Sequence, residues 1–182
     1  MSDETFDEGV LAFLARGLGP LAPGKDLTAQ LLAKAGGRER FLPFMDRVMA
    51  LFDLPEAEAQ GHLHSVDDEG AWEDMLPGVR YRDFECGPAV GEAHGGMVRL
   101  SPGELFPHHT HVGEERVLLL QGELVDDSGN HYRAGDLIVS ADGTSHEMRA
   151  HGDREAVYAA LVTALVFTGS DDDDDDDDDD DY

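Results

Sequence analysis

Histidine and acidic side chains gather in the segment GELFPHHTHVGEERVLLLQG, residues 103–122, at spacings that suit a metal ion. Alternate residues of a strand share a face, so His109 and His111 are expected to point the same way, about 7 Å apart along the backbone. Glu115 follows beyond Gly113, where a glycine allows the chain to bend and return a carboxylate to the same point. The segment therefore predicts three ligands that converge on one ion.

His146 offers a fourth ligand. It stands in the segment GTSHEM, directly after an expected turn, so a neighbouring strand can present it. Three neutral imidazoles and one carboxylate bind Zn²⁺, Fe²⁺, Mn²⁺, Ni²⁺ or Cu²⁺ well, and the ligand types alone do not choose among these ions. We expect one divalent metal ion, with zinc as the first choice and iron, manganese and nickel as alternatives.

From about residue 76 the sequence has the pattern of short strands. Apolar segments such as VRYRDFECG, GMVRLSPG and EAVYAALVTALVF alternate with turn sequences such as DDSGN and SADGTS. Turn signals at intervals of roughly eight to twelve residues are typical of an all-β sandwich or barrel. We therefore expect residues 76–169 to form a mainly β domain that carries the four ligands.

The first third of the chain shows helical periodicity and predicts four short helices within residues 5–66. The clearest apolar stripe follows the i, i+3, i+4, i+7 spacing of one helix face. Its members are Phe41, Phe44, Met45, Val48, Met49 and Phe52. Pro55 is expected in the first turn of the next helix. Residues 1–75 are thus predicted to be a helical region that packs on the β domain, with Trp72 as an anchor, or that docks partly on a partner protein.

The chain is strongly acidic, with 13 basic against 40 acidic residues and a formal net charge of −27. Without the aspartate run 171–181 the balance is still 13 against 29. A direct nucleic-acid binder needs clustered cations that face phosphates, so we expect no binding to DNA or RNA. The aspartates repel one another, and residues 170–182 are expected to be a disordered tail.

Cysteine usage and hydropathy bear on the compartment. Cys86 is the only cysteine, which rules out a disulfide within the chain and fits a reducing cytoplasm. The start MSDETFDEGV lacks the basic residues of a signal peptide. The longest apolar run, AVYAALVTALVF, has about twelve residues and is too short to span a bilayer. We expect a cytoplasmic protein that makes no membrane contact.

The histidine segment resembles the first motif of the cupin family at every fixed position. These positions are Gly103, His109, His111, Glu115 and Gly122. The second cupin motif is matched by Gly135, Gly143 and His146, but alanine replaces the usual proline at Ala141 and a frequent asparagine at Ala150. The resemblance implies a double-stranded β-helix, or jelly-roll barrel, in which the three histidines and the glutamate bind the metal.

A longer pattern, from Phe106 to His146, is similar to the ChrR-type cupins. The matching residues are Phe106, Pro107, His109, His111, Gly113, Glu114, Glu115, Gly122, Asp126, Gly129, Tyr132, Gly135, Asp136, Ser145 and His146. Members of this group are anti-sigma factors, in which a helical N-terminal domain holds a sigma factor and a C-terminal cupin binds a metal and senses stress. The same order of helices before cupin implies a sigma factor or another protein as the partner here.

The resemblance breaks in the helical region. The group's anti-sigma domains carry a zinc site made of a histidine and a Cys-x-x-Cys pair, and this chain has no such pair. His62 and His64 are two residues apart on a predicted helix and should lie on different faces. Either the helices bind a sigma factor without zinc or they have lost that activity.

Three functions remain open at this point. The first is a regulatory metal-binding cupin, and the second is a metal-dependent enzyme of the dioxygenase or isomerase class that acts on a small chelating substrate. Glu123 and Tyr132 are candidate acid or base groups for the second. The third is a module that binds a metal or small ligand without catalysis. A homodimer is expected from the family resemblance, and His108, His131 and His151 are interpreted as surface residues.

Overall fold

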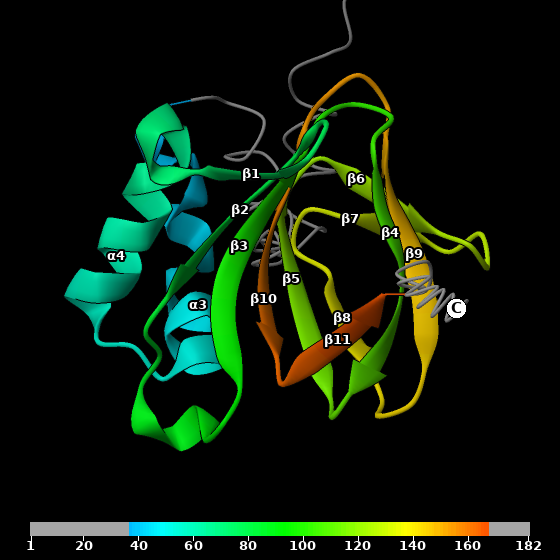
Figure 1. Cartoon of the computed structure of the whole chain (residues 1–182). Helices are drawn as coiled ribbons and strands as arrows, with labels where there is room; N and C mark the ends of the chain where they lie inside the picture. The colour runs from blue at the N-terminus through cyan, green and yellow to red at the C-terminus, as the bar shows by residue number, and fades with distance from the viewer. Residues whose placement is uncertain (1–36, 168–182) are drawn as a thin grey trace, which may run out of the picture.

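The computed structural model describes residues 37–167 of the chain (Figure 1). The two earliest predicted helices and the aspartate run lie outside the described residues. The helical part consists of η1 (Arg38–Phe44), α3 (Met45–Phe52), α4 (Glu56–His64), η2 (Ser65–Asp67) and η3 (Glu69–Ala71). Within residues 37–167, no helix is long and apolar enough to cross a membrane.

The predicted apolar stripe begins as a 3-10 helix, which differs from the single α-helix expected. Pro43 lies inside η1 and has no amide N–H to donate to the carbonyl of Glu39, so regular α-helical bonding starts only at Met45. Phe44 and Val48 are nevertheless fully buried, as the stripe predicted. Pro55 is the N-cap residue of α4, close to its expected place in the first turn.

Two antiparallel sheets make up the β part. The first sheet has the order β1 (Glu73–Leu76), β2 (Val79–Phe84), β3 (His94–Leu100), β10 (Ala156–Val162), β5 (Glu115–Gln121) and β8 (Leu137–Ser140). The second has the order β11 (Ala164–Phe167), β4 (Leu105–Val112), β9 (Ser145–His151), β6 (Glu123–Asp126) and β7 (His131–Arg133). The short helix η4 (Pro88–Val90) joins β2 to β3. The fold is mainly β, a jelly-roll barrel preceded by a small helical region, as predicted.

Alternation along the central strands divides the core into two clusters. On β5, Val117 and Leu119 point into the barrel, while Leu118 and Leu120 point out toward the helices. The inner cluster also contains Tyr158 of β10. A strand that is buried on both faces needs apolar residues at successive positions, which explains the unbroken run VLLL.

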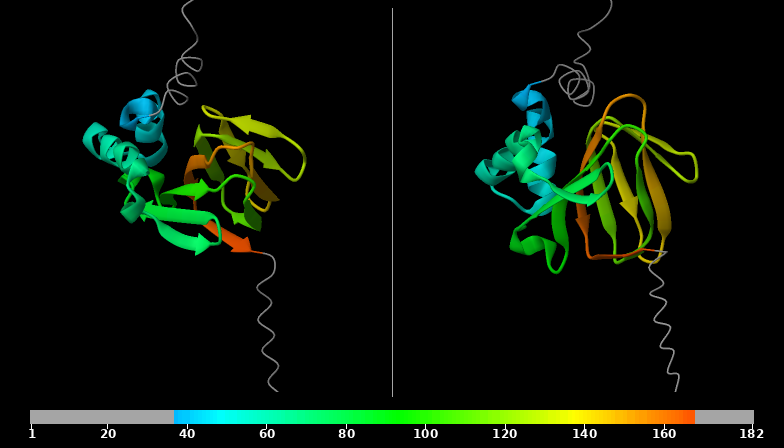
Figure 2. Two further views of the ribbon diagram at one scale, coloured as in Figure 1. Left: turned by 90° about the horizontal axis from the view of Figure 1, so that it is seen from above. Right: turned by 45° about the horizontal axis from the view of Figure 1, so that its top comes forward.

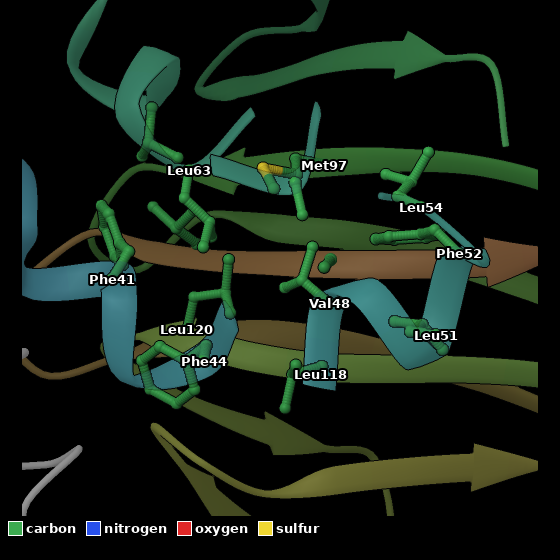
Figure 3. Close-up of a cluster of buried hydrophobic side chains, with 14 of the residues drawn as sticks. Phe41, Phe44, Val48, Leu51, Phe52, Leu54, Leu63, Met97, Leu118 and Leu120 are labelled. Carbon is green, nitrogen blue, oxygen red and sulfur yellow. The ribbon is translucent and has the colours of Figure 1, made fainter. Parts of the chain in front are cut away.

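The outer cluster joins the helices to the barrel. Figure 3 shows Phe44 and Val48 against Leu118 and Leu120 of the sheet. In both views of Figure 2 the helices lie on one side of the barrel, over the six-stranded sheet. Helices and barrel thus share one core.

Trp72 acts as the expected anchor between the two parts. Its ring is buried in the outer cluster, and its indole Nε1 donates a hydrogen bond to the carbonyl of Val66 at 3.1 Å. The guanidinium of Arg99, on β3, lies 4.6 Å from the ring centroid and adds a cation–π contact. The predicted boundary between residues 75 and 76 lies inside β1, and the division into two domains stays a prediction.

We expect Phe44→Ala to reduce the free energy of unfolding by about 3–5 kcal/mol, because it leaves a cavity between the helices and the sheet. Denaturant titration of the full chain measures the loss. Leu137→Ala is the matched control, since this residue of β8 is 50% exposed and its truncation should cost less than about 1 kcal/mol. Equal losses in the two variants would contradict a shared core.

Candidate metal centre

The four predicted ligands come together inside the barrel. His109 and His111 lie on β4, Glu115 begins β5, and His146 lies on β9. His109 and His146 are direct cross-strand partners, so their side chains leave the same face of the second sheet. Their ligand atoms, with those of His111 and Glu115, all lie within 4.8 Å of one another. The alternation argument for His109 and His111 therefore gave the correct face.

A tight turn carries Glu115 to the histidines. Only two residues separate β4 from β5, and the first of them, Gly113, has a φ of +83° that other residues rarely adopt. A Cβ at this position would also meet Oγ1 of Thr163 at 2.7 Å. The amide of Gly113 donates to Oδ1 of Asp142 at 2.8 Å, which ties this turn to the one before β9. The expected bend at Gly113 is confirmed.

Backbone carbonyls set the tautomers of two histidines. Nδ1 of His109 lies 2.7 Å from the carbonyl oxygen of Pro107, and Nδ1 of His111 lies 2.7 Å from that of Thr144. A carbonyl only accepts, so each Nδ1 carries the proton and each Nε2 presents a lone pair to the barrel interior. Metal-binding histidines are oriented in this way by carbonyls or carboxylates behind them.

The lone pairs face a buried acceptor. Nε2 of His111 lies 3.1 Å from Oε2 of Glu115, and Nε2 of His146 lies 3.8 Å from the same oxygen. Nε2 of His109 is buried and has no hydrogen-bond partner within the described part of the chain. Lone pairs and a carboxylate repel one another at such distances unless a cation or a proton lies among them. The donor set therefore fits a divalent metal ion.

Burial shifts the pKa values in the direction that favours metal binding by the histidines. Desolvation lowers the pKa of His109, and it lowers the pKa of His146 to about 4, with the neighbouring imidazoles adding to the effect. Both rings are thus neutral at pH 7 and need no deprotonation before they bind a metal. Burial raises the pKa of Glu115, although His111 opposes this shift.

The walls around the cluster leave little space. Phe106, Leu124, Met148 and Tyr158 are among the mostly apolar residues that line the cavity, whose volume is about 10 Å³. That volume holds roughly one water molecule. Burial raises the pKa of Tyr158 well above its ordinary value, so its hydroxyl stays protonated beside the cluster.

The acid and base candidates of the enzymatic hypothesis lie elsewhere. The hydroxyl of Tyr132 donates to Oδ2 of Asp126 at 2.9 Å, and burial together with this contact raises its pKa to about 12. Glu123 belongs to another group of side chains, on the outer face of the second sheet. His108 is half-buried and not fully at the surface as predicted, whereas His131 and His151 are exposed. Sequence reasoning missed the carbonyl of Thr144, because any residue type could supply it.

Comparison with known proteins fixes the family. Residues 60–165 match the family model described as the ChrR Cupin-like domain, which is more than half of the chain. The chain belongs to this family. The curated proteins that were compared include no match to this ChrR cupin-like chain.

Solved structures are similar to the ChrR cupin-like chain in fold. One match is the crystal structure of Rhodobacter sphaeroides SigE in complex with the anti-sigma ChrR, with 21% identity, a TM-score of 0.51, and coverage of 85% of this chain and 75% of that one. KdgF from Halomonas sp. has 18% identity and a TM-score of 0.46, and the match covers 54% of this chain and 91% of KdgF. An acetylacetone dioxygenase from Acinetobacter johnsonii has 15% identity and a TM-score of 0.47, and the match covers 54% of this chain and 72% of the dioxygenase.

The lowered pKa of His146 predicts a pH-dependent stability of the metal-free protein. Because the unfolded state binds the proton more readily, stability is lost as pH falls from about 6.5 to about 4. We expect His146→Gln, which does not titrate, to lose less stability over this interval than the parent chain. Denaturant titrations at pH 7 and pH 4.5, with chelator present, measure the difference. The same loss in both proteins would show that His146 is not desolvated in the folded state.

Proposed function

We propose that this protein is a regulatory metal-binding cupin whose helical region binds a protein partner of the sigma-factor type. Membership of the ChrR cupin-like family supports the proposal, as does the order of helices before barrel. The observation that carries it is the cluster of His109, His111 and His146 around the carboxylate of Glu115, in which His109 and His111 present inward Nε2 lone pairs. In this proposal these four residues hold one divalent ion, with zinc as the first expectation.

The size of the cavity favours regulation over catalysis on an organic substrate. A catechol or a diketone needs far more room beside the ion than about 10 Å³ provides. The hydroxyl of Tyr132 also donates to Asp126, and Tyr132 does not line this cavity. A metal in this cavity could keep a position only for water or a molecule of similar size, which suits a sensor or a structural ion.

The helical region supplies a surface for a partner. Within residues 37–71 eight acidic residues stand against three basic ones, so a basic partner surface would be attracted. Glu56 and Glu58 in the first turn of α4 are exposed. Arg40 and Asp67, which pair through bonds of 2.5 and 2.6 Å, brace η1 against the segment after α4. Nε of Arg40 also donates to Oε1 of Gln121 on β5 at 3.2 Å, so the acidic surface sits on helices that contact the barrel directly.

Strand β5 offers a route between the ion and the helices. Glu115 begins the strand, and Leu118 and Leu120 of the same strand pack beneath Phe44 and Val48. A change at the ion that shifts Glu115 would be passed to the helices through a strand buried on both faces. In this proposal the affinity of the helical region for the partner depends on whether the metal is bound and on its coordination.

We expect about one tightly held metal per chain in the full-length protein once excess Zn²⁺ has been removed, and a loss of most of it in His146→Ala. Elemental analysis after purification and reloading with Zn²⁺ measures the content. His94→Ala is the matched control, because this exposed histidine of β3 lies outside the cluster. Absence of metal from the parent chain after reloading would remove the chemical basis of the proposal.

We expect a purified sigma factor of the extracytoplasmic class, encoded beside this chain or in the same genome, to form a stable complex with it. Size-exclusion chromatography with light scattering gives the stoichiometry, and it also tests the predicted homodimer. The complex should weaken at least severalfold in His146→Ala and not in His94→Ala. Failure of every such sigma factor to bind, with and without metal, would contradict the proposed partner and leave the metal site standing.

A further inference from the structure

A second group of metal-binding side chains lies on the outside of the barrel. Glu123 on β6, His131 on β7 and His151 on β9 bring one ligand atom each to within 4.8 Å of the others. The two histidines are exposed and the glutamate is half-buried. The surface interpretation of the histidines was correct, but their convergence was not predicted.

Strand register explains why distant residues meet here. Glu123 is the direct cross-strand partner of His151, and His131 lies across from Val125, two residues further along β6. The two imidazoles lean toward each other over β6, with ring centroids 5.1 Å apart. A tetrahedral ion with bonds of about 2.1 Å holds its ligand atoms about 3.4 Å apart. Small side-chain rotations of exposed residues are enough to reach that spacing.

The outer group is separate from the cluster inside the barrel. His146 and His151 share β9 but differ by five positions, so they leave opposite faces of the sheet. Five residues also span on the order of 17 Å along a strand. In Figure 1, β6, β7 and β9 lie on the side of the barrel away from the helices. An ion at the outer group would therefore bind independently of one at the inner cluster.

One cation already contacts the group. Nε of Arg133 lies 3.5 Å from Oε1 of Glu123, and the arginine side chain is 68% exposed. An exposed ion pair at this distance contributes little, so a divalent ion can replace it at small cost. The acidic character of the whole chain attracts cations toward this surface.

We propose that Glu123, His131 and His151 form a second, solvent-exposed site for a divalent transition metal. Two imidazoles and one carboxylate suit Zn²⁺, Ni²⁺ or Cu²⁺, whereas Mg²⁺ and Ca²⁺ prefer sites made only of oxygen ligands. Three protein ligands leave at least one position on the ion to water or to a group from another molecule. The site binds more weakly than the buried one, because exposed ligands must be ordered by the ion itself.

Calorimetric titration of the metal-stripped full chain with Zn²⁺ tests the proposal. We expect two binding events, of which the weaker one loses affinity by about tenfold or more in both His131→Ala and His151→Ala. His146→Ala should remove the tighter event and keep the weaker one, so failure of the inner site does not decide the outer one. In NMR spectra, the imidazole signals of His131 and His151 should shift only with the weaker event.

Controls separate this site from binding elsewhere on the acidic chain. His94→Ala should leave both events unchanged, and Glu123→Gln should weaken the second without affecting the first. Zinc bound by the aspartate run would persist in all of these variants. A weaker event that is unchanged in both His131→Ala and His151→Ala, or the absence of any second event, would overturn the proposal.

Discussion

The burial of one carboxyl group among three imidazoles is the constraint on which the rest of the structure depends. Glu115 is 5% exposed, and His109 and His111 are each 1% exposed. Such groups are costly to remove from water unless a partner of opposite charge or a proton compensates them. The carbonyls of Pro107 and Thr144 hold the imidazoles in the tautomer that makes the repulsion strongest and a metal most favourable.

The two faces of β5 link this constraint to the helical region. Its inward residue Val117 lines the cavity beside Glu115, and its outward residues Leu118 and Leu120 form part of the surface on which the helices pack. Because protein interiors are tightly packed, the strand cannot move on one face without disturbing the other. The barrel thus encloses the proposed ion and also supports the helices that carry the proposed partner surface.

Much of this could be predicted from the sequence because the relevant signals are local. The period-two placement of His109 and His111, the bend at Gly113 and the helical stripe that includes Val48 all follow from short-range geometry. The spacing of apolar residues did not reveal the 3-10 start of the stripe, because it does not register the amide N–H that Pro43 lacks. The outer group of Glu123, His131 and His151 was missed because it depends on register across three strands, which a single sequence does not give.

The shared core of helices and sheet has a consequence for how any partner could dock. Lifting the helices off the barrel would bare an apolar sheet surface that includes Met97, Leu118, Leu120 and Val157. The apolar surfaces of both the helices and the sheet would then be exposed to water. A partner that covered only one of these surfaces would not offset the free-energy cost of exposing both. We therefore expect the proposed partner to contact the outward side of the helices and to leave the helix–barrel interface intact. The proposed partner would then form a further layer on the helices, and the six-stranded sheet would stay buried between the helices and the five-stranded sheet.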